Sequence, residues 1–139
     1  MGNGSEKYKL IKLIKKYQLN KNIKLLDFKK NPYPFIKKSD VFVLSSIFEG
    51  LPNVLLESIV LKKFVISSNC PTGPKEILDN GRGGHIFQMK NPYDLYLKIN
   101  NYLNNINKLK KKIIHSNKRL FRFDYRRNLD KYHNILKII

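Results

Sequence analysis

The amino-acid sequence predicts an α/β fold, a Rossmann-like parallel sheet flanked by helices. Two short runs are rich in β-branched and aromatic side chains: residues 41–44 (VFVL), which are apolar throughout, and residues 64–67 (FVIS), which are apolar up to Ser67. Such runs are typical of strands that are buried on both faces of a parallel sheet. A largely apolar helical stretch, residues 53–61, lies between them. Because strands that alternate with helices through short loops form parallel sheets, we expect these elements to belong to one sheet.

The N-terminal part of the chain predicts one helix and one strand. Residues 5–19 repeat apolar side chains at helical spacing with lysines between them, so they predict an amphipathic helix, which residues 20–22 (NKN) end. Residues 23–28 (IKLLDF) predict a short strand. The two prolines in residues 31–34 (NPYP) break the backbone pattern, and residues 35–38 suit one or two helical turns.

The C-terminal part predicts three further helices and a third strand. A short helix is expected at residues 75–79, and residues 85–88 (HIFQ) suit an edge strand. A long helix begins with Asn-Pro and is expected to cover residues 91–114. The C-terminal segment, about residues 118–139, is basic, and a last helix is expected there at about residues 124–138.

Length and composition favour a single domain from a reducing compartment. The whole chain, residues 1–139, is long enough for one core, and no stretch approaches the ~20 apolar residues of a membrane span. The N-terminal region is charged and amphipathic, so we expect no signal peptide. The single cysteine, Cys70, cannot form an internal disulfide, which favours a cytoplasmic protein.

The formal net charge of +18 leaves two interpretations open. It fits a non-catalytic basic module that binds nucleic acid or an anionic membrane surface, and this module is the alternative function. Lysine greatly outnumbers arginine, however, and the lysines are spread over the whole chain, as they are on solvated faces. We therefore expect no nucleic acid as a partner, and we keep an anionic inner-membrane surface as a candidate.

The stretch from Phe48 to Ile77 contains the first sign of a binding site. Gly50 and Pro52 are turn formers, and Asn53 is expected to be the N-cap of the helix that follows. That helix is apolar almost all round, which predicts burial, yet it carries Glu57. A carboxylate on a buried helix must be paired or must face a cleft that offers hydrogen-bond donors.

Ligands of open parallel sheets bind beyond the carboxyl ends of the strands. This rule places three loops on one rim, at residues 29–33, 45–53 and 68–75. The middle loop leads into a helix N-terminus, where free amides and the helix dipole attract an anion such as phosphate. Glu49 belongs to the same loop. The residues therefore predict a ligand that carries both a phosphate and hydroxyls for a carboxylate to bind.

The motif at this loop resembles a known family signature. Residues 44–57 read LSSIFEGLPNVLLE, and the spacing of Glu49 and Glu57 is similar to the E-x7-E pattern of the family 4 retaining glycosyltransferases of group 1 type. Further segments match the family in the same order; they are residues 31–33 (NPY), 39–43 (SDVFV), 64–67 (FVIS) and 70–77 (CPTGPKEI). The resemblance covers most of residues 2–105. It implies the C-terminal, donor-binding half of a GT-B fold that lacks its first strands.

The resemblance implies a role for each matching residue. Glu49, as the catalytic residue, would contact hydroxyls of the donor hexose and support charge near the anomeric carbon. Glu57 would accept hydrogen bonds from the ribose hydroxyls, and Asn31 and Tyr33 would lie beside the base. The residues that would frame the sugar and the diphosphate are Gly50, Leu51, Pro52 and Asn53. The family stabilises the leaving diphosphate with cationic groups and the helix dipole, so no metal and no other cofactor is expected.

The implied function is transfer of a hexose from a nucleotide-diphosphate sugar, linked to UDP or GDP, to a polysaccharide or lipid-linked acceptor. The run at residues 70–77 resembles bacterial transferases that build surface polysaccharides. A whole GT-B enzyme also has an N-terminal acceptor domain. The chain is therefore expected to be a fragment or a truncated gene product, or to be completed by a separate acceptor-domain chain, and to lack turnover by itself. The implied location is the cytoplasm, with the inner face of the membrane as an attachment surface.

Simpler interpretations of single residues stay open. An ion pair with a lysine would also account for Glu57, and Glu49 would also suit a solvated turn. Cys70 is expected in an exposed loop without a catalytic role, because no histidine is near it in the sequence. Surface positions are expected for His85, His115 and His133.

Overall fold

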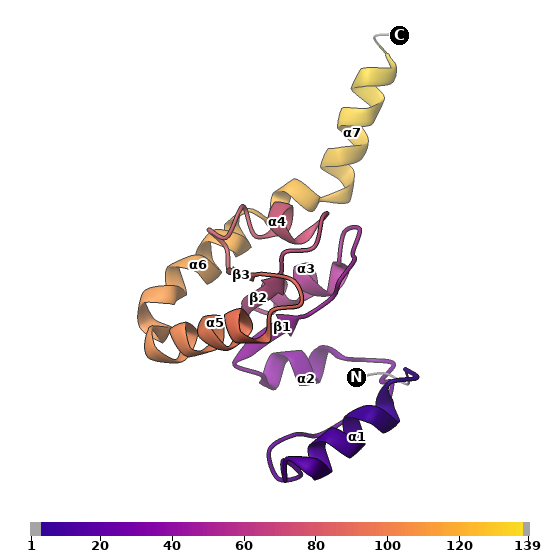
Figure 1. Ribbon diagram of the computed structural model, residues 1–139. Helices are drawn as coiled ribbons and strands as arrows, with labels where there is room; N and C mark the ends of the chain where they lie inside the picture. The colour runs from indigo at the N-terminus through magenta and orange to yellow at the C-terminus, as the bar shows by residue number, and fades with distance from the viewer. Residues whose placement is uncertain (1–3, 138–139) are drawn as a thin grey trace. The chain divides into compact units, whose positions relative to one another are not determined.

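Figure 1 shows the computed structural model of the protein, which describes residues 4–137. The chain divides into two compact units, and the boundary lies between Pro34 and Phe35. The second unit contains the parallel sheet.

The first unit is organised around helix α1 (Lys7–Lys16), which is shorter at both ends than the predicted helix. None of its residues is fully buried. An ion pair between Lys7 and Asp27 connects α1 to the segment that follows it. The hydrogen bond from Lys7, and then its charge, hold the pKa of the Asp27 carboxyl below its ordinary value.

The prediction of a strand at residues 23–28 is wrong. No strand is present among residues 4–34, the described part of the first unit. A strand needs a neighbour to pair its backbone, and apolar or β-branched side chains are not sufficient without one. The side chains of Ile23 and Phe28 are 42% and 71% exposed, so the segment also lacks the burial of a central strand.

The second unit has a three-stranded parallel sheet in the order β1-β2-β3. Its strands are β1 (Val41–Leu44), β2 (Phe64–Ser68) and β3 (His85–Phe87). Every residue of the central strand β2 is buried, whereas every residue of β1 is half-buried. The parallel sheet that the apolar runs predict is confirmed.

Helices connect the strands. Helix α2 (Tyr33–Lys38) crosses the boundary between the units and precedes β1. Helix α3 (Asn53–Val60) connects β1 to β2, and α4 (Pro74–Ile77) connects β2 to β3. These short crossovers are the strand–helix alternation that the sequence indicates.

Two apolar clusters cover the two faces of the sheet, because successive side chains of a strand point to opposite faces. Val65 of β2 packs with Leu55 and Ile77 from α3 and α4. Phe64 packs with Tyr102 and Leu109 from the helices that follow β3. The unit is therefore layered, with α3 and α4 on one face of the sheet and α5 (Pro92–Asn104) and α6 (Ile106–Lys118) on the other.

The prediction of a single helix at residues 91–114 is wrong, because two helices occupy this region. They are α5 (Pro92–Asn104) and α6 (Ile106–Lys118). Asn105 between them has φ −133°, which interrupts the helical backbone. The break allows Tyr102 from α5 and Leu109 from α6 to enter the same apolar cluster. Burial of both side chains decides the bend, and no proline or glycine in the sequence marks it.

The chain ends in a short 3-10 helix, η1 (Leu120–Phe123), and in α7 (Tyr125–Leu136). Asp124 caps α7, since its carboxylate accepts a hydrogen bond from the backbone N–H of Arg127 at 2.9 Å. The predicted last helix is therefore confirmed. Figure 1 shows α7 extending away from the sheet, and no residue of α7 is buried. Among residues 4–137, no helix has both the length and the apolar character that crossing a bilayer requires.

A polar cluster around Asp79 joins the end of α4 to α6. The carboxylate of Asp79 lies 2.7 Å from Nε2 of His115, and Arg119 and Arg82 lie 3.7 and 3.9 Å from the same oxygen. The hydrogen bond with His115 holds the pKa of Asp79 below its ordinary value, against the opposing effect of burial, and the arginine charges assist. Lys112 donates to the carbonyl oxygens of Gly81 and Gly84, and burial lowers the pKa of its ammonium group.

Candidate functional site

The candidate site is built on the loops that leave the carboxyl ends of β1 and β2. Because the two strands are parallel neighbours, with Leu44 opposite Ser67, both loops start at the same rim of the sheet. The first loop runs from Ser45 to Pro52 and enters α3; the second runs from residue 69 to Gly73 and enters α4. The rim predicted from the sequence therefore contains these two loops.

Glu49 lies half-buried in the first loop, and its side chain is held in place. The hydroxyl of Ser46 donates a hydrogen bond to Oε1 of Glu49 at 2.7 Å. Among residues 4–137, Ser46 is the one hydrogen-bond donor to this carboxylate. The second carboxylate oxygen, Oε2, therefore keeps its capacity to accept a hydrogen bond from a ligand.

The second loop contacts the first loop at its backbone. The hydroxyl of Thr72 donates to the carbonyl oxygen of Glu49. The next residue, Gly73, is buried and has φ +81°, and a Cβ atom there would lie 2.1 Å from the carbonyl oxygen of Gly50 and 2.6 Å from Cδ of Pro52. Only glycine fits both the left-handed backbone and the contact. The two loops therefore form one packed unit around Glu49.

The start of α3 differs from the prediction. Asn53 is not the N-cap but the first residue of the helix, and it is exposed. Pro52 occupies the cap position in an extended conformation, and no side chain caps the helix. The backbone of Pro52 decides this, because a fixed proline φ followed by an extended ψ already turns the chain into the helix. The first amides of α3 consequently have no side-chain acceptor.

The remaining predicted framing residues lie at the open side of this turn. Gly50 and Leu51 are exposed, and a Cβ atom added at Gly50 would have no atom within 4 Å. Pro52 is buried beneath them, against Gly73. Gly50 and Leu51 are thus accessible to a ligand, whereas Pro52 supports the turn from inside.

Helix α3 is not buried all round, contrary to the prediction. Its buried residues Leu55, Ser58 and Ile59 form one face, whereas Val60 is 59% exposed. Glu57 is half-buried and lies one turn before the exposed end of the helix. The helix therefore has one buried and one exposed side although its sequence is largely apolar, because it packs on one face of the sheet only. Glu57 is not a carboxylate in an apolar core.

Asn31 and Tyr33 lie in the first unit and form a local turn. The side-chain oxygen of Asn31 accepts a hydrogen bond from the backbone N–H of Tyr33 at 3.1 Å. This Asx turn begins α2, and both side chains are exposed. The predicted role of these residues beside a base stays a prediction.

Two predictions about surface residues are wrong. Cys70 is 1% exposed, with its Sγ 3.8 Å from the hydroxyl of Ser68, because the second loop folds back over the end of β2. His85 and His115 are half-buried and have partners: Nε2 of His85 lies 2.9 Å from Oδ1 of Asn101, and His115 contacts Asp79 as described above. The third histidine, His133, is exposed as expected.

The described chain offers no arrangement of side chains that suits a metal ion. Within residues 4–137, His, Cys, Asp and Glu side chains do not gather in groups of three or more.

The sequence did not assign a role to Ser46, Ser68, Thr72 or Gly73, which hold the site together. Only the role of Ser46 could have been inferred from neighbouring residues, because a hydroxyl three residues before Glu49 suits a hydrogen bond within a turn. Thr72 contacts a residue 23 positions away, so its role depends on the pairing of β1 with β2.

The pattern of the family described as "Glycosyl transferases group 1" matches residues 1–120. The chain belongs to this family. The match includes both loops of the candidate site and the whole parallel sheet.

Curated relatives are similar over parts of the chain. MJ1059, a glycosyltransferase of Methanocaldococcus jannaschii, is 50% identical over 78 residues, which are 56% of this chain and 19% of the relative. An N-acetylgalactosaminyltransferase of Campylobacter jejuni that acts on a diphospho-undecaprenol-linked sugar is 31% identical over 96 residues, 69% of this chain and 26% of the relative. The chain thus spans about a fifth to a quarter of the length of these relatives.

Solved structures share the fold. Anabaena HepE in complex with UDP superposes with a TM-score of 0.87 over 99% of this chain and 40% of its own, at 19% identity. TarM superposes with a TM-score of 0.83 over 94% of this chain and 26% of its own, at 22% identity. The fold is therefore the Rossmann-like α/β architecture of GT-B glycosyltransferases.

Proposed function

We propose that this chain is the donor-binding portion of a retaining glycosyltransferase. In this proposal it binds a nucleotide-diphosphate sugar, linked to UDP or GDP, whose hexose passes to a polysaccharide or lipid-linked acceptor in bacterial surface glycan synthesis. The observation that carries the proposal is the fixed carboxylate of Glu49 at the rim of the sheet, directly before the uncapped start of α3. A carboxylate suits sugar hydroxyls, and free amides at a helix start suit a diphosphate.

The similar proteins support this choice of ligand. HepE structures contain UDP, UDP with glucose, and UDP-glucose. Relatives named for O-antigen and amylovoran biosynthesis support a surface polysaccharide as the product. We therefore infer a sugar nucleotide for this chain from its family, and a hexose from the hydroxyl-binding character of Glu49.

Each predicted residue has one role in the proposal. Glu49 binds hydroxyls of the hexose and stabilises positive charge that develops at the anomeric carbon. The amides at the start of α3, near Asn53, and the helix dipole stabilise negative charge on the leaving diphosphate. Glu57 accepts hydrogen bonds from the ribose hydroxyls, and Asn31 and Tyr33 lie beside the base. No step in this scheme requires a metal ion.

In our proposal, this chain needs an additional acceptor-binding part for turnover. Because the chain spans about a quarter or less of the first two curated relatives, an acceptor-binding part is supplied by further sequence or by a separate chain. We expect the chain to bind the donor without transferring its sugar. Whether transfer retains the anomeric configuration of the donor sugar is then measured on the completed enzyme, by NMR of the product.

The experiment that tests donor binding is isothermal titration calorimetry with UDP, GDP, UDP-glucose and GDP-mannose, with and without EDTA. We expect one nucleotide series to bind, the sugar nucleotide to bind more tightly than its nucleoside diphosphate, and EDTA to have no effect. Absence of binding in both series contradicts the proposal, and loss of binding in EDTA contradicts its metal-free form.

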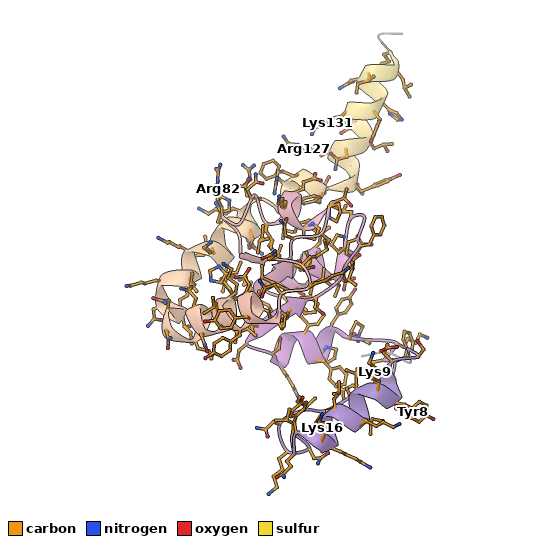
Figure 2. The ribbon with its side chains drawn as sticks, in the orientation of Figure 1. Tyr8, Lys9, Lys16, Arg82, Arg127 and Lys131 are labelled. Atoms are coloured by element: carbon orange, nitrogen blue, oxygen red, sulfur yellow. The ribbon has the colours of Figure 1, made fainter. Side chains whose placement is uncertain are left out.

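We also propose that the chain attaches to an anionic membrane surface through α7, on the cytoplasmic side. The helix presents one exposed apolar stripe at helical spacing: Tyr125, Leu129, Tyr132 and Leu136. Figure 2 shows Arg127 and Lys131 projecting from the same helix, and Arg126 is exposed beside them. An amphipathic helix with cations beside an apolar stripe suits the interface of anionic lipids.

A further inference from the structure

Three hydroxyl side chains around Glu49 have no role in the donor contacts proposed above. Ser46 precedes Glu49 in the first loop, Ser68 ends β2, and Thr72 lies in the second loop. Together they make hydrogen bonds to the side chain of Glu49, to its backbone, and to the residue that holds it. Their arrangement indicates what this part of the site does.

Ser68 fixes the backbone of Ser46. Ser68 is 1% exposed, and its hydroxyl donates to the carbonyl oxygen of Ser46 at 2.5 Å, across 22 residues of sequence. This hydrogen bond lies just beyond the β1–β2 ladder, whose last pair is Leu44 with Ser67. A buried side chain therefore extends the attachment of β1 to β2 into the loop, so that Ser46 has a defined position relative to the sheet.

Ser46 in turn fixes the carboxylate of Glu49. Its hydroxyl donates to Oε1 at 2.7 Å, so its single proton is already committed to Glu49. The Ser46 oxygen and the Oε2 oxygen of Glu49 can then only accept hydrogen bonds. Two neighbouring acceptors without a donor suit two neighbouring hydroxyl groups of a ligand.

Thr72 holds the same residue by its backbone. Its hydroxyl donates to the carbonyl oxygen of Glu49, and Gly73 packs against Gly50 directly after it. The side chain of Glu49 is thus attached to the first loop, and its main chain to the second loop. Movement of either loop would displace the carboxylate.

We propose that Ser46 and Thr72 are positioning residues for Glu49, and that the Ser46 oxygen together with Oε2 of Glu49 accepts two adjacent hydroxyls of the donor hexose. This inference rests on the proposed function, because it requires a hexose at Glu49. It adds a specificity element: the donor sugar carries a free vicinal diol at this position.

The test compares Ser46→Ala with the wild-type chain in calorimetric titrations of UDP, UDP-glucose, GDP and GDP-mannose. Loss of a hydrogen bond to a charged group should weaken binding of the sugar nucleotide about tenfold and of its nucleoside diphosphate less than about twofold. Ser46→Thr retains the hydroxyl and should restore most of the affinity. Ser39→Ala is the matched control, because it removes a serine hydrogen bond of 2.8 Å to the carbonyl of Ile36, outside the two loops.

A double-mutant cycle separates positioning from a purely structural effect. Glu49→Ala removes the carboxylate that Ser46 positions, so Ser46→Ala should weaken binding of the sugar nucleotide less in the Glu49→Ala background than in the wild type, and the loss that remains measures the direct contact of the Ser46 oxygen. Additive losses overturn the positioning role. Thr72→Val should weaken the sugar nucleotide selectively as well, and Thr72→Ser should restore it.

The failure of this inference differs from the failure of the proposed function. If the wild-type chain binds neither the uridine nor the guanosine compounds, both the proposed function and this inference are overturned. Wild-type binding that Ser46→Ala leaves unchanged, or weakens equally for UDP and UDP-glucose, overturns the inference alone. Thermal melts of each variant show whether it is folded, and a folded Ser46→Thr that binds no better than Ser46→Ala also overturns it.

Discussion

A Cβ atom on Gly73 would lie 2.1 Å from the carbonyl oxygen of Gly50, on the neighbouring loop. Gly73 also has φ +81°, which L side chains rarely adopt. The contact joins the loop after β2 to the turn that contains the candidate sugar-binding residues. Backbone packing between the loops, rather than the motif alone, therefore determines the shape of the site.

Gly73→Ala should destabilise the fold. Backbone strain together with a clash against backbone atoms should cost more than about 2 kcal/mol, which lowers the melting temperature by about 5–10 °C. Gly50→Ala is the matched control, because its Cβ would meet no atom within 4 Å, and it should change the stability by less than about 0.5 kcal/mol. Equal melting temperatures for both variants would show that the loops do not pack in this way.

Glu57→Ala should weaken binding of the preferred nucleotide itself. Removal of a carboxylate that accepts ribose hydroxyls should cost about 1.5–3 kcal/mol, or about 10- to 150-fold in Kd. UDP and its sugar nucleotide should lose affinity alike, unlike the selective loss expected for Ser46→Ala. Asp130→Ala removes an exposed carboxylate of α7 and serves as the control. Calorimetry that finds normal UDP and GDP binding in Glu57→Ala would remove this residue from the site.

The stability of the fold should fall as the pH drops from about 7.5 to 5.5, in part through His85. Burial against Phe64, whose ring centre lies 5.0 Å away, lowers the pKa of His85, and the hydrogen bond with Asn101 opposes this shift. The folded chain therefore binds the proton less readily than the unfolded chain. Its stabilising effect is complete above the unfolded pKa of about 6.5 and is lost as the pH falls from that value through the lower folded pKa.

An NMR titration of the histidine side chains checks this directly. The His85 imidazole should titrate below the ordinary value, and His85→Gln should reduce the dependence of unfolding free energy on pH in this range. A normal titration of His85 would contradict the burial that the structure gives it.

Asp79→Asn should lower the melting temperature at neutral pH. The variant loses the charged hydrogen bond with His115 and leaves Arg119 and Arg82 without their shared carboxylate. Because the folded pKa of Asp79 is lowered, its stabilising effect is present above the unfolded pKa of about 3.9 and is lost as the pH falls through the folded value. The stability difference between wild type and variant should therefore be smaller at pH 3 than at pH 7, and chemical denaturation at the two pH values measures this. Asp130→Asn should behave like the wild type at both values.

Attachment to membranes should depend on the cations of α7. Arg126→Gln together with Lys131→Gln should weaken binding to phosphatidylglycerol-containing vesicles by about 2 kcal/mol, since each cation near the surface contributes about 1 kcal/mol. Lys108→Gln together with Lys110→Gln removes the same net charge from exposed positions of α6 and should have a smaller effect. Co-sedimentation at increasing salt measures both. Equal losses in the two double variants would mean that net charge, not α7, drives attachment, and tight binding to duplex DNA instead would favour a nucleic-acid module.

Patterns of neighbouring residues in the sequence were sufficient to predict the parallel sheet, the family and the loop that carries the candidate site. The runs at residues 41–44 and 64–67 predicted strands correctly because two-sided burial in a parallel sheet selects continuous apolar side chains. The spacing of Glu49 and Glu57 within a longer ordered motif predicted the family. This motif is local, because the turn and the helix that carry the two glutamates are adjacent in the chain. Local chemistry was sufficient for these conclusions.

Features that depend on residues far apart in the sequence could not be predicted from it and became visible in the three-dimensional fold. Residues 23–28 have the composition of a strand but no neighbour to pair with in their unit, and Asn105 interrupts a helical pattern so that Tyr102 and Leu109 can share one core. The contacts of Ser68 with Ser46 and of Thr72 with Glu49 join residues 22 and 23 positions apart. Such contacts exist because parallel pairing of β1 with β2 brings their loops to one rim, and a linear pattern of side chains does not carry that information.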